Sequence, residues 1–453
     1  MDSDWTTLSR EQKRARRFEW YSSTEGIRFD SPAAETAYRV RAKRMIDVYN
    51  LSEPDRVPVA LPVGSLPVEY AGIDYGTAMY DAEKAAQAWL KFNLETGLDV
   101  FAVPNVPAGK MLDLLDYRLY RWPGHGMAKD GMGYQFVEAE YMAPEEYDAL
   151  IRDPSDFWLR TYLPRVFGTF EPFRMLQSFT PVTELPMVTP HFMPYARPEV
   201  QASLQKLIDI GKTLANWTQV VSTVGRRGRE LGFPAFGSCY AKAPFDTIGD
   251  TLRGTKGIIL DMRRRPEKLL KALDVVAQIT IDTTIASLNA SRGQIALFPL
   301  HKGADGWMSE TQFRTFYWPT LKRVVDGLIE EGIMPTLFAE GGFETRLALV
   351  NEFPKGAVNW LFDQTDMEKA KKALGDRCCI SGNVPASLMI TGSPKDVKDH
   401  CRKLIERCGE GGGFILAAGT NSIEGANIEN LRAMVEAAAE YGVYAKEQRA
   451  QSQ

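Results

Sequence analysis

The stretch Met334–Glu344, MPTLFAEGGFE, combines a short apolar run with a carboxylate and two glycines. The apolar run ends at Phe338, and Glu340 follows it, directly before Gly341 and Gly342. In a parallel α/β protein this pattern predicts a buried strand with an acidic side chain at its carboxyl end. The glycines let the backbone turn closely around whatever lies there. Taken alone, the stretch fits equally well an acidic residue that only begins a solvated loop.

Apolar runs and helical patterns alternate along most of the chain. The runs expected to be strands are residues 56–63, 98–103, 233–239, 294–300, 334–338, 357–362, 378–380 and 413–418. Helical patterns separate most of them, including one over residues 345–353. Eight such units predict a distorted (β/α)8 TIM barrel. A doubly wound open sheet is the competing fold, and it is disfavoured because no predicted strand runs into a GxGxxG turn.

The barrel is expected to occupy residues 51–445, between a helical N-terminal extension and a short tail. The extension, residues 1–50, is charged, and two interpretations stay open for its first half: an arm that supports a homodimer, or a mobile segment. Residues 105–198 interrupt the alternation and predict an insertion after the second strand, on the mouth of the barrel. Its aromatic residues form either a lid or the insertion's own core. Residues 446–453 are the tail.

Composition excludes several classes of partner. The 453 residues are 44% hydrophobic and 25% charged, with a net charge of −4, so neither a nucleic acid nor an anionic membrane is an expected partner. No run approaches about 18 apolar residues, which excludes a membrane span. The five cysteines form no CxxC pair, which favours reduced thiols in the cytoplasm.

Polar residues at the predicted strand ends would converge at one mouth. His301 is the candidate acid or base, Glu340 the candidate base or ligand, and Asp363 the orienting carboxylate. The alternatives are a histidine bonded at the barrel rim and an aspartate that caps the next helix. No HxH, HxxxH or HExxH spacing occurs, so no metal site is predicted. The expected substrate contacts are Tyr240, Asp305, Phe338, Asn383 and Thr420.

Several segments resemble the uroporphyrinogen decarboxylase superfamily, which includes corrinoid-linked methyltransferases. They are DRVPV (55–59), PTLFAEGG (335–342), GN (382–383), GGFIL (412–416) and EN (429–430), and the similarity covers residues 55–110 and 232–445. The resemblance implies a distorted (β/α)8 barrel, in agreement with the strand count. It also implies one-carbon chemistry or decarboxylation.

Two departures from the family's patterns narrow the expected chemistry. The resembled methyltransferases hold zinc with a His-x-Cys and a later Cys, and the matching positions here are Phe338, Glu340 and Thr420. Zinc–thiolate activation is therefore not expected. The decarboxylases carry arginines near the first strand, whereas residues 62–72, PVGSLPVEYAG, contain none. A polycarboxylated tetrapyrrole would then lack partners for its charges.

The resemblance and these departures together favour an enzyme that transfers a methyl or other one-carbon group from a small organic substrate. A corrinoid (cobalamin), or a corrinoid protein, is the expected partner, and no tightly bound cofactor is predicted. A metal-independent decarboxylase or C–C lyase is the alternative. A second alternative is a non-catalytic protein that binds a corrinoid or another small molecule.

Overall fold

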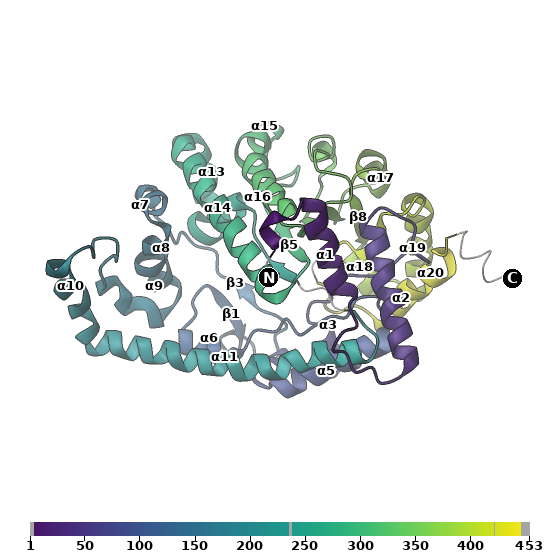
Figure 1. Cartoon of the computed structure of the whole chain (residues 1–453), viewed down its shortest axis with the longest axis horizontal. Coiled ribbons are helices and arrows are strands. Elements are labelled where there is room, and N and C mark those ends of the chain that lie inside the picture. The colour runs from purple at the N-terminus through teal and green to yellow at the C-terminus, as the bar shows by residue number, and fades with distance from the viewer. Residues whose placement is uncertain (1–3, 235–237, 421, 445–453) are drawn as a thin grey trace.

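The computed structural model describes residues 4–234, 238–420 and 422–444. Its centre is a six-stranded parallel sheet in which each strand pairs with the next along the chain (Figure 1). The strands are β4 Ser238–Tyr240, β5 Ile295–Leu300, β6 Met334–Ala339, β7 Asn359–Phe362, β8 Cys379–Val384 and β9 Phe414–Ala418. All side chains of β6, β7 and β9 are buried, as expected for strands covered on both faces.

Helices connect most of these strands and pack on the outside of the sheet. They are α12 Pro244–Asp246, α13 Gly254–Arg264, α14 Pro266–Ser291, α15 Glu310–Gln312, α16 Trp318–Glu330, α17 Met367–Leu374, α18 Ala386–Thr391, α19 Pro394–Cys408 and α20 Ile428–Tyr441. The helix expected over residues 345–353 is wrong, because only a 3-10 turn, Glu344–Arg346, forms there. Pro354 disfavours helical backbone at Phe353. In addition, the Asn351 side chain donates to the Ala373 carbonyl oxygen at 2.8 Å.

The first two predicted strands join the sheet through isolated backbone hydrogen bonds. The amide of Leu416 in β9 donates to the Pro58 carbonyl oxygen at 2.9 Å, and the Asp99 amide donates to the Val59 carbonyl oxygen at 3.0 Å. The prediction of regular strands over 56–63 and 98–103 was therefore wrong in extent. In the first segment Pro58 and Pro62 lack the amide that a ladder requires, and in the second the Asn93 side chain bonds both the amide and the carbonyl oxygen of Ala102, at 2.8 and 2.7 Å. These segments still follow β9 in the order that a barrel demands. The prediction of a distorted (β/α)8 barrel is confirmed.

A buried carboxylate fixes these two segments to each other. Asp99 is fully buried, accepts a hydrogen bond from the Val59 amide at 2.8 Å, and forms an ion pair with Arg56 at 2.8 Å. It also contacts Arg44, which lies on the N-terminal helix α2. One side chain thus joins the N-terminal extension to the irregular part of the barrel.

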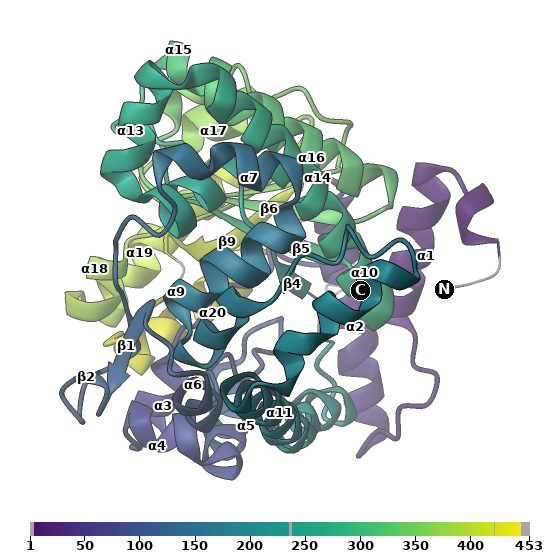
Figure 2. The same cartoon turned by 90° about the vertical axis from the view of Figure 1, so that its left-hand side faces the viewer.

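The N-terminal helices close one end of the barrel. Helices α1 (Arg10–Ser22) and α2 (Pro32–Tyr49) place Tyr21, Tyr38 and Met45 in a buried cluster with Met334 and Cys379, which lie at the first residues of β6 and β8. In Figure 2 these two helices lie on one side of the sheet, and α18 lies on the opposite side. The carboxyl ends of the strands therefore open away from the extension.

The segment between the second barrel unit and β4 forms a side lobe. It contains a β-hairpin, with Tyr120 of β1 paired antiparallel to Phe136 of β3. Phe157 is buried in the main core of the barrel and Phe173 in a separate core of the lobe, so neither ring forms a lid. The lobe's elements are α6 Gly109–Leu115, β1 Tyr120–Pro123, β2 Gly126–Met127, β3 Gln135–Phe136, α7 Tyr147–Arg152, α8 Pro154–Phe157, α9 Leu163–Val166, α10 Leu185–Phe192 and α11 Pro198–Glu230. Helices α3 Leu66–Tyr70, α4 Tyr75–Tyr80 and α5 Ala82–Thr96 lie earlier, between the first two barrel segments.

Figure 1 shows α7 to α10 gathered at one end of the long helix α11, away from the N-terminal helices. Within the part of the chain that the structure describes, no helix combines the length and the apolar composition needed to cross a membrane.

Candidate active site

The three candidate catalytic residues lie at the ends of three adjacent strands. His301 follows β5, Glu340 follows β6, and Asp363 follows β7. The His301 Nε2 atom lies 3.8 Å from Glu340 Oε1, and the Gly341 amide donates to Asp363 Oδ2 at 2.9 Å. Parallel pairing of β5, β6 and β7 produces this arrangement, because it brings the carboxyl ends of the strands to one edge.

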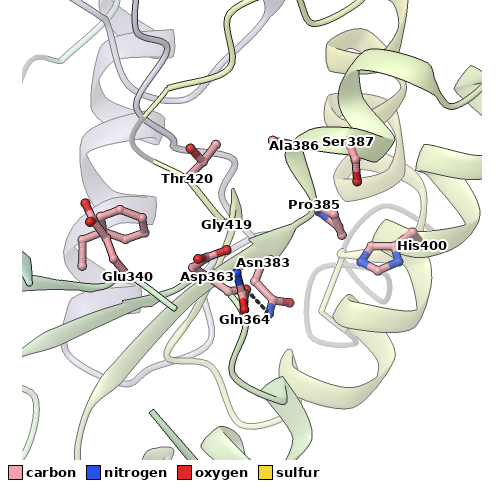
Figure 3. Close-up of a pocket in the computed structure, with 11 residues that line it drawn as sticks. Glu340, Asp363, Gln364, Asn383, Pro385, Ala386, Ser387, His400, Gly419 and Thr420 are labelled. Atoms are coloured by element: carbon pink, nitrogen blue, oxygen red, sulfur yellow. Dashed lines mark hydrogen bonds between the residues drawn. The ribbon is translucent and has the colours of Figure 1, made fainter. Parts of the chain in front are cut away.

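Two cavities open at this edge, and the pair formed by His301 and Glu340 lies where they meet. The first has a volume of about 740 Å³, and Figure 3 shows Glu340 and Asp363 beside it, below Thr420. Phe338 and Asn383 also line it. The second, of about 560 Å³, is lined by His301 and Tyr240 among others. The structure thus brings seven of the eight candidate residues to the mouth.

The eighth candidate, Asp305, lines neither cavity. Its carboxylate accepts hydrogen bonds from the Thr345 hydroxyl at 2.6 Å and from the Thr345 amide at 3.1 Å, and it lies 3.4 Å from Arg346. Asp305 therefore braces the loop after β5 against the turn after β6. The structure gives it a positioning role where a substrate contact was expected.

The interpretation of Asp363 as a helix cap is also wrong, because Asp366 caps α17 by accepting from the Lys369 amide at 2.9 Å. The Asn383 amide nitrogen donates to the carbonyl oxygens of Asp363 and Thr365, at 2.8 and 2.9 Å. Its donor capacity is thus used to hold the loop after β7, and its carbonyl oxygen is the group that can face a ligand.

His301 forms a close pair with an aspartate that the sequence did not single out. Its Nδ1 atom lies 2.6 Å from Asp250 Oδ2. The same carboxylate accepts from Lys242 Nζ at 2.8 Å and from Lys302 Nζ at 2.7 Å. Burial acts to raise the pKa of Asp250, but the hydrogen bond from His301 and the charges of the two lysines outweigh it and hold that pKa well below its usual range. Asp250 is therefore a fixed negative charge against the imidazole.

The surroundings of His301 favour its protonated form. Burial lowers the pKa of the imidazole, but the hydrogen bond and charge of Asp250, with the charges of Asp246 and Glu340, outweigh burial and raise it. Burial raises the pKa of Glu340, and the positive charge of His301 opposes this effect in part. The pair thus provides a proton donor and a neighbouring carboxyl group at neutral pH.

Asp246 holds the backbone that carries His301. Its carboxylate accepts from the amides of His301 and Lys302 at 3.0 and 3.1 Å, and from the Tyr317 hydroxyl at 2.7 Å. Burial and the charge of Asp250 raise the pKa of Asp246 to about 6. These contacts fix the turn after β5, and so they set the direction of the imidazole.

Sequence reasoning missed Lys242, Asp246 and Asp250, and it placed Lys302 at a strand end without a role. One signal was present: Asp246 and Asp250 lie four residues apart at the start of a helical pattern, a spacing that puts both carboxylates on one helical face. His400 was missed as well. It lines the first cavity on the far side of Asn383 (Figure 3). Burial lowers its pKa.

The described residues contain no group of three or more His, Cys, Asp or Glu side chains arranged to hold a metal ion. The positions matched to the zinc ligands of the resembled methyltransferases carry an aromatic ring at Phe338, a carboxylate at Glu340 and a hydroxyl at Thr420. This donor set lacks both thiolates and the imidazole, so it does not fit that zinc site.

Comparisons with known proteins agree with this architecture. The family model for uroporphyrinogen decarboxylase (URO-D) matches residues 181–441. Uroporphyrinogen decarboxylases from Cellvibrio japonicus and Saccharophagus degradans are 25% and 24% identical to the chain over 239 and 257 residues, which are 51% and 53% of it. The chain spans 65% and 68% of the lengths of those two relatives.

A solved structure described as a methyltransferase from Methanosarcina mazei superimposes with a TM-score of 0.58 at 14% sequence identity. The superposition covers 89% of this chain and 98% of that one. At this level of identity the match shows a common fold.

Proposed function

Because this chain belongs to the uroporphyrinogen decarboxylase family, we propose that it is an enzyme that transfers a methyl or other one-carbon group from a small organic substrate. The observation that carries the proposal is the His301–Asp250 pair, 2.6 Å apart, which faces Glu340 at the carboxyl ends of the strands. A reaction that breaks a bond between a methyl carbon and a heteroatom leaves an electron pair on the heteroatom. A proton donor at this place stabilises that leaving group.

His301, Asp250 and Glu340 then each have a defined task. His301 gives its Nε2 proton to the heteroatom as the bond to the methyl carbon breaks. Asp250 keeps the imidazole oriented and charged through Nδ1. Glu340, 3.8 Å from Nε2, stabilises the imidazolium before transfer. The three groups come from different barrel segments, so the fold itself fixes their geometry.

The proposed acceptor is a corrinoid brought by a partner protein, which would supply the nucleophile for the methyl group. Corrin side chains end in neutral amides, and the first cavity presents neutral polar groups on Gln364, Asn383, Ser387 and Thr420 that can pair with amides. The lining residues therefore fit such a group. They fit a polycarboxylate less well, since none of the described residues around either cavity is an arginine.

The second candidate is a decarboxylase or C–C lyase, favoured by the same proton donor, which could protonate the carbanion left by a departing carbon dioxide. One experiment separates the two. The purified chain is incubated with methylated donors and a reduced corrinoid, with the corrinoid followed by absorbance, and carbon dioxide release is measured in parallel with carboxylated substrates.

We expect methyl transfer, and we expect Glu340→Gln to slow it by about 10² or more. Carbon dioxide release without methyl transfer would support the second candidate. Neither activity, together with tight corrinoid binding, would support a non-catalytic binding protein. Unchanged turnover in Glu340→Gln would remove Glu340 from the mechanism.

A further inference from the structure

The second cavity has walls rich in tyrosine. Tyr75, Tyr120, Tyr134 and Tyr240 line it, and they come from α4, from β1, from the loop before β3 and from the end of β4. Tyr240 and Tyr134 are 69% and 54% exposed although both line a hollow. Large aromatic side chains left open inside a cavity are typical of a surface that a ligand covers.

The charges of this cavity are divided between its two walls. On one wall Lys242 and His301 share the single carboxylate of Asp250, at 2.8 and 2.6 Å, with Lys302 as its third partner. On the other wall Glu424 accepts two hydrogen bonds from Ser65, both at 3.1 Å, through its Oε1 atom. No cation pairs with Glu424 among residues 4–234, 238–420 and 422–444.

A second carboxylate lies close to Glu424. The neighbouring Gly425 amide donates to Glu69 at 2.8 Å, and this contact places the two acidic residues together. Burial raises the pKa of Glu69, and the charge of Glu424 raises it further. This wall therefore carries negative charge that the described side chains leave without a counter-ion.

Resting on the proposed function of the same mouth, we propose that the tyrosine-lined cavity binds a small methylated ammonium ion, the methyl donor. Tyrosine ring faces attract cations, and an ammonium ion whose protons are replaced by methyl groups has no strong donor to lose when it leaves water. Glu424 supplies the opposite charge. Bound there, the ion would lie in the cavity that His301 also lines, next to the proposed proton donor.

The test compares two ligands of one shape. Choline and 3,3-dimethyl-1-butanol have the same outline, and only choline carries a positive charge. Binding of each to the full chain is measured by isothermal titration calorimetry. We expect choline to bind at least about tenfold more tightly, the effect of cation–π contact with a matched carboxylate. Equal affinities, or no binding of choline, would overturn the inference.

Substitutions then assign the contacts. Glu424→Gln should weaken choline binding about tenfold and leave binding of the neutral alcohol unchanged, because it removes charge and keeps shape. Tyr134→Leu should weaken choline binding, whereas Tyr134→Phe, which retains the ring, should not. Glu410→Gln is the matched control, since this exposed carboxylate lies before β9, at the opposite end of the barrel. An equal loss in Glu410→Gln would contradict a role for the cavity.

The outcomes also separate this inference from the proposed function. Choline binding without methyl transfer from any donor leaves the ammonium site standing, and overturns both the proposed function and the ion's assignment as methyl donor. Methyl transfer from a neutral donor, without choline binding, overturns the inference alone. If neither choline binding nor methyl transfer is observed, both the inference and the proposed function are overturned.

Discussion

Replacing Asp250 with asparagine tests the electrostatic basis of the site. Asp250 lies 2.6 Å from His301, 2.8 Å from Lys242 and 2.7 Å from Lys302, so Asp250→Asn leaves three cationic groups without their shared counter-ion. The shape of the side chain is retained. The imidazolium of His301 then loses its main stabilising contact, and the pKa of His301 should fall.

The expected size follows from the geometry. Loss of one opposite charge at hydrogen-bond distance removes about 1 to 4 kcal/mol of stabilisation from a charged group. The His301 side chain is 36% exposed, so solvent screening places the effect toward the lower end of this range. Even 1.4 kcal/mol corresponds to about a tenfold change in the imidazole protonation equilibrium.

NMR titration of the histidine side chains measures this change directly. The other three histidines, His125, His191 and His400, serve as internal controls, and the His301 signal is assigned by its absence in His301→Ala. The midpoint of the His301 titration should move to lower pH in Asp250→Asn, while the controls stay in place. An unchanged His301 midpoint would refute the electrostatic account of the site.

Stability gives an independent reading of the same effect. The pKa of His301 is raised in the folded protein, so its contribution to stability is complete below the ordinary value of about 6.5 and is lost as the pH rises through the raised value. The difference in unfolding free energy between wild type and Asp250→Asn should therefore be larger at about pH 6 than at about pH 9. Urea unfolding at the two pH values measures it, and a difference that grows with pH would contradict the argument.

Three further changes should have distinct effects. Asp99→Ala should destabilise the fold by about 3 to 5 kcal/mol in urea unfolding, because it removes the buried carboxylate that pairs with both Arg56 and Arg44. The triple variant Phe338→His, Glu340→Cys, Thr420→Cys should bind about one zinc ion by metal analysis, whereas the double variant that retains Thr420 should bind zinc more weakly. Asp305→Ala should cost about 1 to 3 kcal/mol of stability in thermal unfolding by releasing the brace to the turn after β6, and wild-type stability would remove that role.

The alternation of apolar runs with helical patterns was sufficient to predict the barrel. The run ending at Phe338 forms β6 within one residue of its expected end, and Val358–Phe362 lies in and beside β7. The first strand was harder to delimit, because Pro58 and Pro62 keep the apolar pattern of a strand but remove amides that regular pairing needs. A helix over residues 345–353 was predicted from spacing alone, which takes no account of the constraint that Pro354 places on the preceding residue.

The candidate site likewise contains residues that the sequence could predict and residues that it could not. Residues at strand ends could be predicted, because parallel topology forces them to one edge, and Glu340 and Asp363 were found by that rule. Asp250 could not be placed, since it lies 51 residues from His301 along the chain and its position depends on how the helical segment after β4 packs. The roles of Lys242 and Lys302 could not be predicted either, because they depend on the fold that places both lysines and His301 around the Asp250 carboxylate.

The meeting of two cavities at His301 and Glu340 gives the proposed reaction a physical layout. The tyrosine-lined cavity presents aromatic rings and the carboxylate of Glu424, whereas the first cavity presents amides and hydroxyls beside the carboxylates of Glu340 and Asp363, so the two cavities favour different ligands. A methyl donor in one and an acceptor in the other would meet where His301 stands 3.8 Å from Glu340. The carboxyl group of Glu340 fits this layout, because a carboxylate stabilises the protonated imidazole of His301. A zinc site at the same place would not require a protonated imidazole. The segment that resembles the family most closely is thus also the one whose side chains point to proton transfer in place of zinc chemistry.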